Sequence, residues 1–347
     1  MKSHTIFLFT DYRGQFYSST RHKGASVDLE RLKHSFRTLG HELDIRPFSS
    51  IDFRTQNYKD KWVLYQSSED PGRFYRDYVE DVILGLFLQG ARLIPDFLKF
   101  RAHHNKHFME IVRDLHHSPE IQNIQALRYG TFEDYARDTR RISNGDFVLK
   151  ASDSSKSRGV SLMRSTRDKI RLPKKVSRTP SMTNLRYCIE GLKTGEKPLF
   201  ISNHRNKFIL QPFIDGLPGD YRVVIYGDKF YVLSRENRPD DFRASGSGRF
   251  DFNRQVPEGL LDYARTVFKS FDVPFMAMDI GLKQREFYLF EFQFLSFGQY
   301  TLEKSGFFYR FENNSWSKVS ERPDLEREIA ASVAWYILRH ARKEWKE

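Results

Sequence analysis

Residues 275–293 have the sequence FMAMDIGLKQREFYLFEFQ. Two apolar stretches flank the polar residues 283–285, so the pattern predicts a β-hairpin. The midpoint between Asp279 and Glu291 lies inside this turn, which predicts that the two carboxylates face each other across the ladder. Gln293 shares a face with Glu291, because side chains alternate along a strand.

Two opposed carboxylates with no basic residue between them repel each other, and a bound cation removes this repulsion. Their oxygen atoms suit Mg²⁺, which keeps several waters and takes phosphate oxygens as further ligands. We therefore predict a magnesium site at Asp279, Glu291 and Gln293, with Mn²⁺ as an alternative ion. The competing interpretation is that the acids are solvated on an exposed sheet face.

The composition is that of a folded protein with a basic bias. A chain of 347 residues has room for two or three domains, and 39% hydrophobic content with 31 Phe excludes global disorder. Cys188 is the single cysteine, and we see no signal-like or membrane-spanning segment, so we expect a cytoplasmic protein. The net charge of +12 predicts an anionic partner, but the basic stretch from Arg164 to Arg178 is interpreted as solvated surface.

The first hundred residues alternate between strand and helix patterns, which predicts an open α/β domain over residues 1–100. Ser26 is the expected cap of the first helix, and Gly40 is its expected stop. The predicted elements are, in order, a strand at 6–10, a helix carrying Leu29, Leu32, Phe36 and Leu39, strands at 42–46 and 62–65, a helix at 74–89 and a strand at 92–95.

The rest of the chain is predicted to form two further regions, residues 101–215 and 216–347. Residues 173–207 show no sustained period, and we interpret the segment near 165–207 as an insertion. The predicted elements are a helix with Phe108, Ile111, Val112 and Leu115 on one face, a helix capped at Thr131, a hairpin of 147–150 and 160–163, a strand at 208–213, a hairpin around Gly227-Asp228, a helix at 258–271, and a last helix opened by Pro323.

Two loops are candidates for phosphate binding. Lys150 closes an apolar strand just before the Ser/Gly loop 151–159, so it can reach phosphates that the loop amides cradle. Residues 154–159 lack the spacing of a Walker P-loop and of a dinucleotide fold. Arg243 precedes the Gly/Ser-rich residues 244–248, which fits a triphosphate clamp or a mobile loop.

Together these residues resemble the ATP-grasp superfamily, most closely its carboxylate–amine ligases typified by the ribosomal protein S6 glutamate ligase. The resemblance covers about residues 100–300. It implies an α/β fold, α+β in parts, in which an N-terminal open α/β domain precedes two subdomains that clasp ATP. The corresponding regions would be residues 1–100, 101–215 and 216–347.

The resemblance implies roles for residues of this sequence, motif by motif. Lys150 and Lys106, the latter in Asn105-Lys106, match the lysines that contact phosphates. Pro212 and Phe213 match the hinge whose backbone meets the adenine. The remaining matches are Asp220 for the ribose, Arg243 and Ser245 within the family's DFRxN motif, and Asp279, Glu291 and Gln293 for the metal.

Two positions depart from the family pattern. The family has asparagine where this chain has Gln293 and Ser245. Neither change removes a charge, so we expect a working enzyme, with an inactive nucleotide-binding protein as the alternative.

The implied activity is an ATP- and Mg²⁺-dependent ligase that forms a carbon–nitrogen bond. A small-molecule or peptide carboxylate attacks the γ phosphorus to give an acylphosphate, and an amine then displaces phosphate. The candidate catalytic residues are Arg222, Arg235 and Arg243, which would stabilise the oxyanion of the tetrahedral intermediate.

Four alternatives remain open. A kinase on the same scaffold would fit the three predicted metal ligands equally well. A nucleic-acid-binding protein fits the charge but lacks any recognisable reader module. His103 and His107 stand one helical turn apart, but no Cys or acid is spaced to complete a zinc site. The loops 11–14 and 66–70 follow apolar strands and are either an acceptor pocket or ordinary polar loops.

Overall fold

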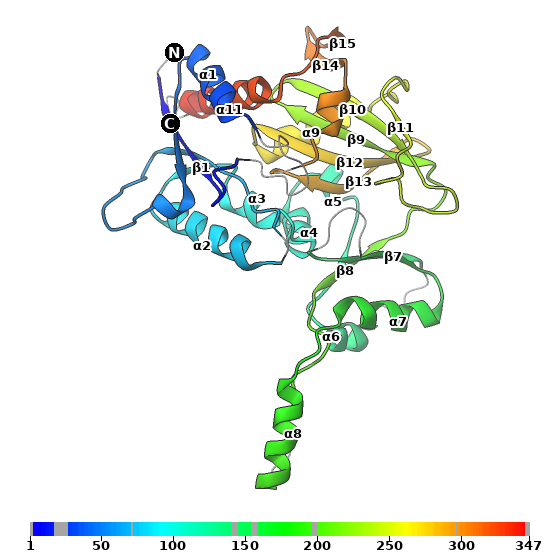
Figure 1. The fold of residues 1–347 in the computed structure, drawn as a ribbon. Helices are drawn as coiled ribbons and strands as arrows, with labels where there is room; N and C mark the ends of the chain where they lie inside the picture. The colour runs from blue at the N-terminus through cyan, green and yellow to red at the C-terminus, as the bar shows by residue number, and fades with distance from the viewer. Residues whose placement is uncertain are drawn as a thin grey trace. The chain divides into compact units, whose positions relative to one another are not determined.

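A computed structural model of the chain describes residues 3–16, 27–70, 72–139, 145–153, 159–195, 200–295 and 297–343. The chain forms two compact units, of which the larger combines Met1–His103 with Pro218–Glu347 and the smaller is His104–Leu217 (Figure 1). These boundaries lie close to the predicted ones at 100/101 and 215/216. The division of the larger unit into two domains stays a prediction.

A parallel sheet forms the N-terminal part of the larger unit, in the order β2-β1-β3-β4. Its elements confirm the predicted alternation: β1 (Thr5–Thr10), α1 (Leu29–Thr38), β2 (Glu42–Pro47), β3 (Trp62–Leu64), α2 (Phe74–Leu88) and β4 (Arg92–Ile94), with the short helices η1 (Phe48–Ser50) and α3 (Phe97–Ala102). Ser26, the expected cap of α1, lies outside the described residues; Asp28 directly precedes the helix, and its side chain accepts hydrogen bonds from the amides of Glu30 and Arg31. Gly40, with φ of +80°, follows its end as predicted.

The C-terminal part of the larger unit is a seven-stranded antiparallel sheet in the order β13-β12-β9-β10-β14-β15, with β11 paired to β10. The strands are β9 (Gly219–Tyr226), β10 (Lys229–Glu236), β11 (Phe250–Asp251), β12 (Phe275–Lys283), β13 (Glu286–Gln293), β14 (Phe307–Glu312) and β15 (Ser315–Ser320). The hairpins β9–β10 and β12–β13 confirm two predictions. The strands β14 and β15 were not predicted, because the outer strand β15 is polar and largely exposed.

The helices of this region are α9 (Leu260–Phe271), α10 (Tyr300–Lys304) and α11 (Leu325–Lys343). The predicted apolar stripe of the last helix is confirmed, because Ile329, Val333 and Ile337 are buried. They belong to one hydrophobic cluster with Leu8 of β1 and Val224 of β9. This shared core explains why the two ends of the chain form a single unit.

The pairing of Asp279 with Glu291 is confirmed, and a β-bulge produces it. The turn pairs Lys283 with Glu286, and an unbroken ladder from there would bring Phe290 opposite Asp279. The register shifts between Asp279 and Ile280, and Phe290 is the extra residue of β13. The shift sets Glu291 opposite Asp279.

The smaller unit is built on an antiparallel sheet in the order β5-β8-β6-β7. Its strands are β5 (Leu127–Tyr129), β6 (Phe147–Ala151), β7 (Val160–Met163) and β8 (Phe208–Pro212), so the predicted hairpin and the strand after it are confirmed. Its helices are α4 (Lys106–Leu115), α5 (Pro119–Gln122), α6 (Phe132–Arg137), α7 (Thr166–Ser177) and α8 (Thr183–Thr194). An aromatic cluster including Tyr135 and Phe208 packs on one face of the sheet.

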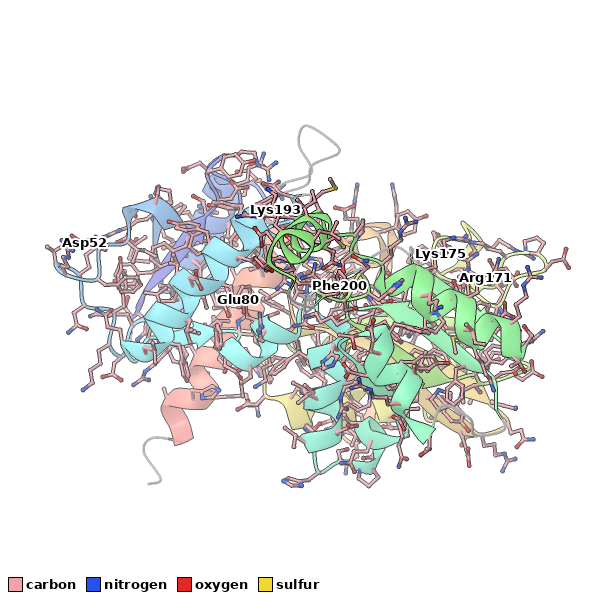
Figure 2. All side chains as sticks on the ribbon, turned by 90° about the horizontal axis from the view of Figure 1, so that it is seen from below. Asp52, Glu80, Arg171, Lys175, Lys193 and Phe200 are labelled. Atoms are coloured by element: carbon pink, nitrogen blue, oxygen red, sulfur yellow. The ribbon has the colours of Figure 1, made fainter. Side chains whose placement is uncertain are left out.

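Two helices occupy the segment near 165–207 that was interpreted as an insertion. A capping box of Ser165 and Asp168 begins α7, which continues through a buried Pro173. Proline is unfavourable inside a helix, so the sequence pattern did not predict that a helix continues through residue 173. In α8 no described side chain is buried. Figure 2 shows Arg171 and Lys175 on α7, and both are exposed, in agreement with a solvated basic surface.

No helix among the described ranges is long and apolar enough to cross a membrane.

Candidate active site

One face of the large sheet gathers predicted site residues from four neighbouring strands. The register pairs Asp279 of β12 with both Arg222 of β9 and Glu291 of β13. It also pairs Arg235 of β10 with Asp220 of β9. Residues two apart on a strand share a face, so we call the charged face the set Asp220, Arg222, Arg235, Asp279, Glu291 and Gln293.

Two arginines bind the acids of the charged face. Arg222 donates to Asp279 Oδ1 at 2.8 Å and to Gln293 Oε1 at 3.1 Å. Arg235 donates to both Asp220 oxygens at 2.6 and 2.8 Å, and its NH2 lies 3.0 Å from Asp279 Oδ1. Arg222 and Arg235, which were predicted to lie beside this site, therefore supply the positive charge that the hairpin itself lacks. The compensating charge comes from strands outside the hairpin, which the hairpin's own pattern does not include.

Burial makes these pairs strong. The Arg235 side chain is only 6% exposed. Burial disfavours ionisation of Asp279, but Arg235 and Arg222 outweigh it and hold the pKa of this carboxyl below its ordinary value. Burial raises the pKa of Asp220 against the opposing effect of Arg235. Three carboxylates against two guanidiniums leave the charged face with a formal charge of −1, which suits a cation.

The predicted metal ligands have the oxygen chemistry that a magnesium ion requires. Asp279, Glu291 and Gln293 offer oxygen atoms on one sheet face; the Asp279 side chain is 12% exposed, and Glu291 and Gln293 are partly buried. Gln293 Nε2 donates to Glu291 Oε1 at 3.2 Å, which couples these two side chains. Each oxygen can accept more than one bond. A metal bound here would share Asp279 and Gln293 with Arg222.

Arg243 lies in a loop that fixes it through its own motif. Its Nε and NH2 donate to the carboxylate of Asp241 at 2.8 and 2.6 Å. This hydrogen bond lowers the pKa of Asp241. The carbonyl oxygen of Ser245 accepts from Arg238 at 3.0 Å. Arg243 therefore has a set orientation, while its side chain stays 31% exposed.

The smaller unit holds the other predicted site residues. Lys106 starts α4, and its amide donates to the carbonyl of Ser152 just after β6. Lys150 lies on β6 opposite Ile209. The amide of Phe213 donates to the carbonyl of Asp146 at 3.0 Å, and Pro212 has no amide proton. A backbone contact to a ligand at these two hinge residues therefore has to use a carbonyl oxygen.

Beside Met109, the face of α4 that the smaller unit buries carries polar side chains. Glu110 and Arg113 are fully buried, whereas Leu115 of the expected apolar face is 73% exposed. Glu110 accepts from Gln211 Nε2 at 2.6 Å and from Arg113 Nε at 2.7 Å. This network was not predicted, because Gln211 lies 101 residues from Glu110, although Arg113 is close along the chain.

Loops after two neighbouring strands meet in the larger unit. Arg13, after β1, lies 3.0 Å from Asp11 Oδ2 and 3.0 Å from Asp70 Oδ1, which follows β3. β1 and β3 are adjacent in the parallel sheet. The two loops considered for an acceptor pocket therefore lie side by side, and that role stays a prediction.

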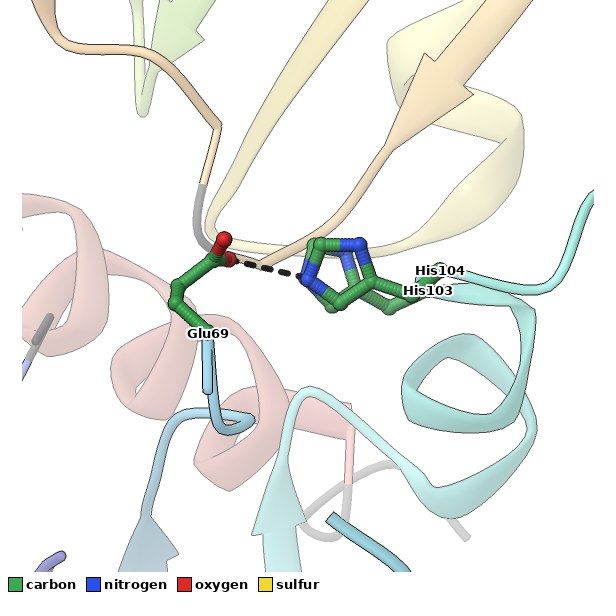
Figure 3. A group of neighbouring side chains, drawn as sticks. All are labelled: Glu69, His103 and His104. Atoms are coloured by element: carbon green, nitrogen blue, oxygen red, sulfur yellow. Dashed lines mark ion pairs between the residues drawn. The ribbon is translucent and has the colours of Figure 1, made fainter. Parts of the chain in front are cut away.

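The structure corrects one premise about the histidines. Glu69 lies beside His103, with Oε1 3.9 Å from Nε2, although no acid is near this histidine in the sequence (Figure 3). Of the phosphate loop predicted at 154–159, residues 154–158 lie outside the described residues.

Solved structures provide the comparison with known proteins. The chain superposes on the crystal structure of D-cycloserine synthetase DcsG with a TM-score of 0.53 and 14% identity, covering 95% of this chain and 98% of that one. It superposes on a RimK domain protein, ATP-grasp, from Sphaerobacter thermophilus DSM 20745 with a TM-score of 0.50 and 11% identity, covering 96% and 98%. The chain has the ATP-grasp fold.

The resemblance predicted this fold from motifs, and the comparison confirms it. No protein-family model matches the sequence, and no curated protein sequence matches it. Within the ATP-grasp fold, the predicted site residues divide between the units. The smaller unit holds Lys106, Lys150, Pro212 and Phe213, and the larger holds Asp220, Arg222, Arg235, Arg243, Ser245, Asp279, Glu291 and Gln293.

Proposed function

We propose that the chain is an ATP-dependent ligase that joins a carboxylate to an amine and releases ADP and phosphate. The observation that carries the proposal is the charged face, where acids and arginines stand together on adjacent strands. Phosphoryl transfer needs such a combination, because negative charge must be both held and neutralised. The ATP-grasp fold and its likeness to a named synthetase support this proposal.

The smaller unit would bind the base and phosphates of the nucleotide. Lys106 and Lys150 would contact the phosphates as point charges. Carbonyl oxygens at Pro212 and Phe213 would accept hydrogen bonds from the exocyclic amine of adenine.

The larger unit would bind the ribose and a metal. Asp220 would accept from a ribose hydroxyl, which requires part of its carboxylate to remain available beside Arg235. Asp279, Glu291 and Gln293 would hold Mg²⁺, whose contribution when bound is to neutralise phosphate charge.

The reaction would proceed in two balanced steps. An oxygen of the substrate carboxylate bonds to the γ phosphorus while the bond to the ADP oxygen breaks. The amine nitrogen then bonds to the acyl carbon, phosphate leaves, and the nitrogen loses a proton. Arg222 and Arg243 are more exposed than Arg235, so they are better placed to stabilise the oxyanion, and Arg235 would position the acids.

Phosphorus NMR of the products tests the proposal. The protein is incubated with ATP, Mg²⁺ and panels of carboxylates and amines, and hydroxylamine is added to trap an acylphosphate as a hydroxamate. We expect ADP and free phosphate, with turnover that requires a carboxylate. A stable phosphoester would assign a kinase instead, and AMP with pyrophosphate would contradict the mechanism.

Two variants link the activity to the charged face. Asp279→Asn and Glu291→Gln each remove a charge with little change in shape, so turnover should fall at least about a hundredfold while the far-UV circular dichroism stays unchanged. The matched control is Asp228→Asn, in the exposed β9–β10 turn. Near wild-type turnover in either site variant would contradict the assigned role.

A further inference from the structure

A third lysine lies close to the start of α4 in the smaller unit. Lys207 Nζ donates to Asn105 Oδ1 at 2.9 Å, and Asn105 is the residue directly before Lys106. The same nitrogen lies 3.8 Å from Asp153 Oδ1. The amide of Ser152 donates to the carbonyl of Lys207, which holds the start of β8 against the end of β6.

The strand register puts Lys207 and Lys150 on the same face of the sheet. Lys150 pairs with Ile209, so these two side chains lie on one face of the sheet. Lys207 lies two residues before Ile209, and side chains two apart along an extended strand share a face. The aromatic cluster occupies the other face, which carries Phe208. Gln211 also lies on the lysine face and contacts Glu110 of α4, so α4 packs against this side.

Lys207 lies at the end of β8 away from the hinge. At about 3.3 Å per residue, the strand runs roughly 10 Å from Pro212 to Ile209 and roughly 17 Å from Pro212 to residue 207. A nucleotide whose base lies at the hinge therefore passes Lys150 before its phosphate tail reaches Lys207. Burial, and then the charges of Lys207 and Arg128, lower the pKa of His107.

We propose that Lys207 binds the terminal phosphate of the nucleoside triphosphate and makes the site discriminate ATP from ADP. The inference rests on the proposed nucleotide function and adds a residue to it. The Lys207 side chain is 24% exposed, so it keeps access to a ligand. Asn105 would position it through the hydrogen bond to Nζ.

Isothermal titration with ATP and with ADP, each with Mg²⁺ and without carboxylate, tests the proposal. We expect Lys207→Met to raise the Kd of ATP about tenfold, the loss of one charge-assisted contact, and to change the Kd of ADP less than twofold. Lys207→Arg keeps the charge and should restore most of the ATP affinity. Lys193→Met is the control, because Lys193 is exposed on α8.

The outcomes separate this inference from the function on which it rests. If the wild type binds ATP and ADP but Lys207→Met keeps the same ratio of their Kd values, Lys207 does not bind the terminal phosphate. Binding of neither nucleotide by the folded wild type would overturn the proposed function as well. If Lys207→Met does not fold, Lys207→Arg and Lys207→Gln are compared by the same ratio, and an equal ratio in both overturns the inference.

Discussion

Arg235 is the residue on which the charge balance of the large sheet depends. It contacts both Asp220 and Asp279, and its side chain is 6% exposed. Replacing every member of a buried ion pair by apolar residues often changes the stability of a protein little. Removing one member alone leaves an uncompensated buried charge, which is strongly destabilising. The contribution of Arg235 should therefore become visible when it alone is removed.

Arg235→Met should lower the free energy of unfolding by about 3–5 kcal/mol, because Asp220 and Asp279 would then repel each other away from water. Urea denaturation followed by tryptophan fluorescence measures the change. The control is Arg249→Met, whose 53% exposed side chain pairs with Glu236 at 2.7 Å and should matter by less than about 1 kcal/mol. Equal losses in the two variants would show that burial is not the cause.

At the scale of elements, local chemistry sets where helices begin, and packing sets which face they bury. The capping patterns at Thr131 and at Ser165 both begin helices. The buried face of α4 could not be predicted from such local patterns. Burial of the Glu110 carboxylate is costly unless Gln211 and Arg113 donate hydrogen bonds to it. The paired strands β14 and β15 were missed because β15 is mostly exposed and carries no clear alternation.

The start of α7 should depend on pH through Asp168. Hydrogen bonds from Ser165 lower the pKa of this carboxyl in the folded chain, so its contribution to stability is fully present above its unfolded pKa of about 3.9 and is lost as the pH falls through the lowered folded pKa. The stability difference between wild type and Asp168→Asn should therefore be constant from about pH 7 to 5 and shrink below about pH 4.

Circular dichroism during urea unfolding at each pH measures this difference. Ser165→Ala removes the other half of the capping box and should destabilise the helix by about 1 kcal/mol at neutral pH. A difference for Asp168→Asn that is as large at pH 3 as at pH 7 would refute the assigned role of the charge.

At the scale of the whole molecule, the chain forms two units, and the larger one contains both ends of the sequence. The core that joins Leu8 with Val224 and Val333 accounts for this arrangement. The net charge of +12 is compatible with a polyphosphate ligand, but it favours nucleic acid equally. Thermal stabilisation of the fold by ATP tests nucleotide binding directly.

ATP with Mg²⁺ should raise the melting temperature, because a ligand that binds only the folded state stabilises it by mass action, by about 2.7 kcal/mol at a concentration one hundred times its Kd. Differential scanning fluorimetry measures the shift, with ATP plus a chelator as the control. The Asp279→Asn variant should lose the magnesium-dependent part of the shift in melting temperature. A folded sample that shows no shift at millimolar ATP and Mg²⁺ would contradict nucleotide binding.

The sequence by itself determined the alternation of the N-terminal sheet and the hairpins, because period and turn chemistry act between residues close along the chain. The bulge at Phe290, which sets Glu291 opposite Asp279, appeared only in the structure. Only the tertiary structure decided which charges compensate these acids. Arg222 lies 57 residues from Asp279, and Glu110 lies 101 residues from the Gln211 that makes its burial possible. Buried charges require partners, and the fold, not the local pattern, brings such distant partners together.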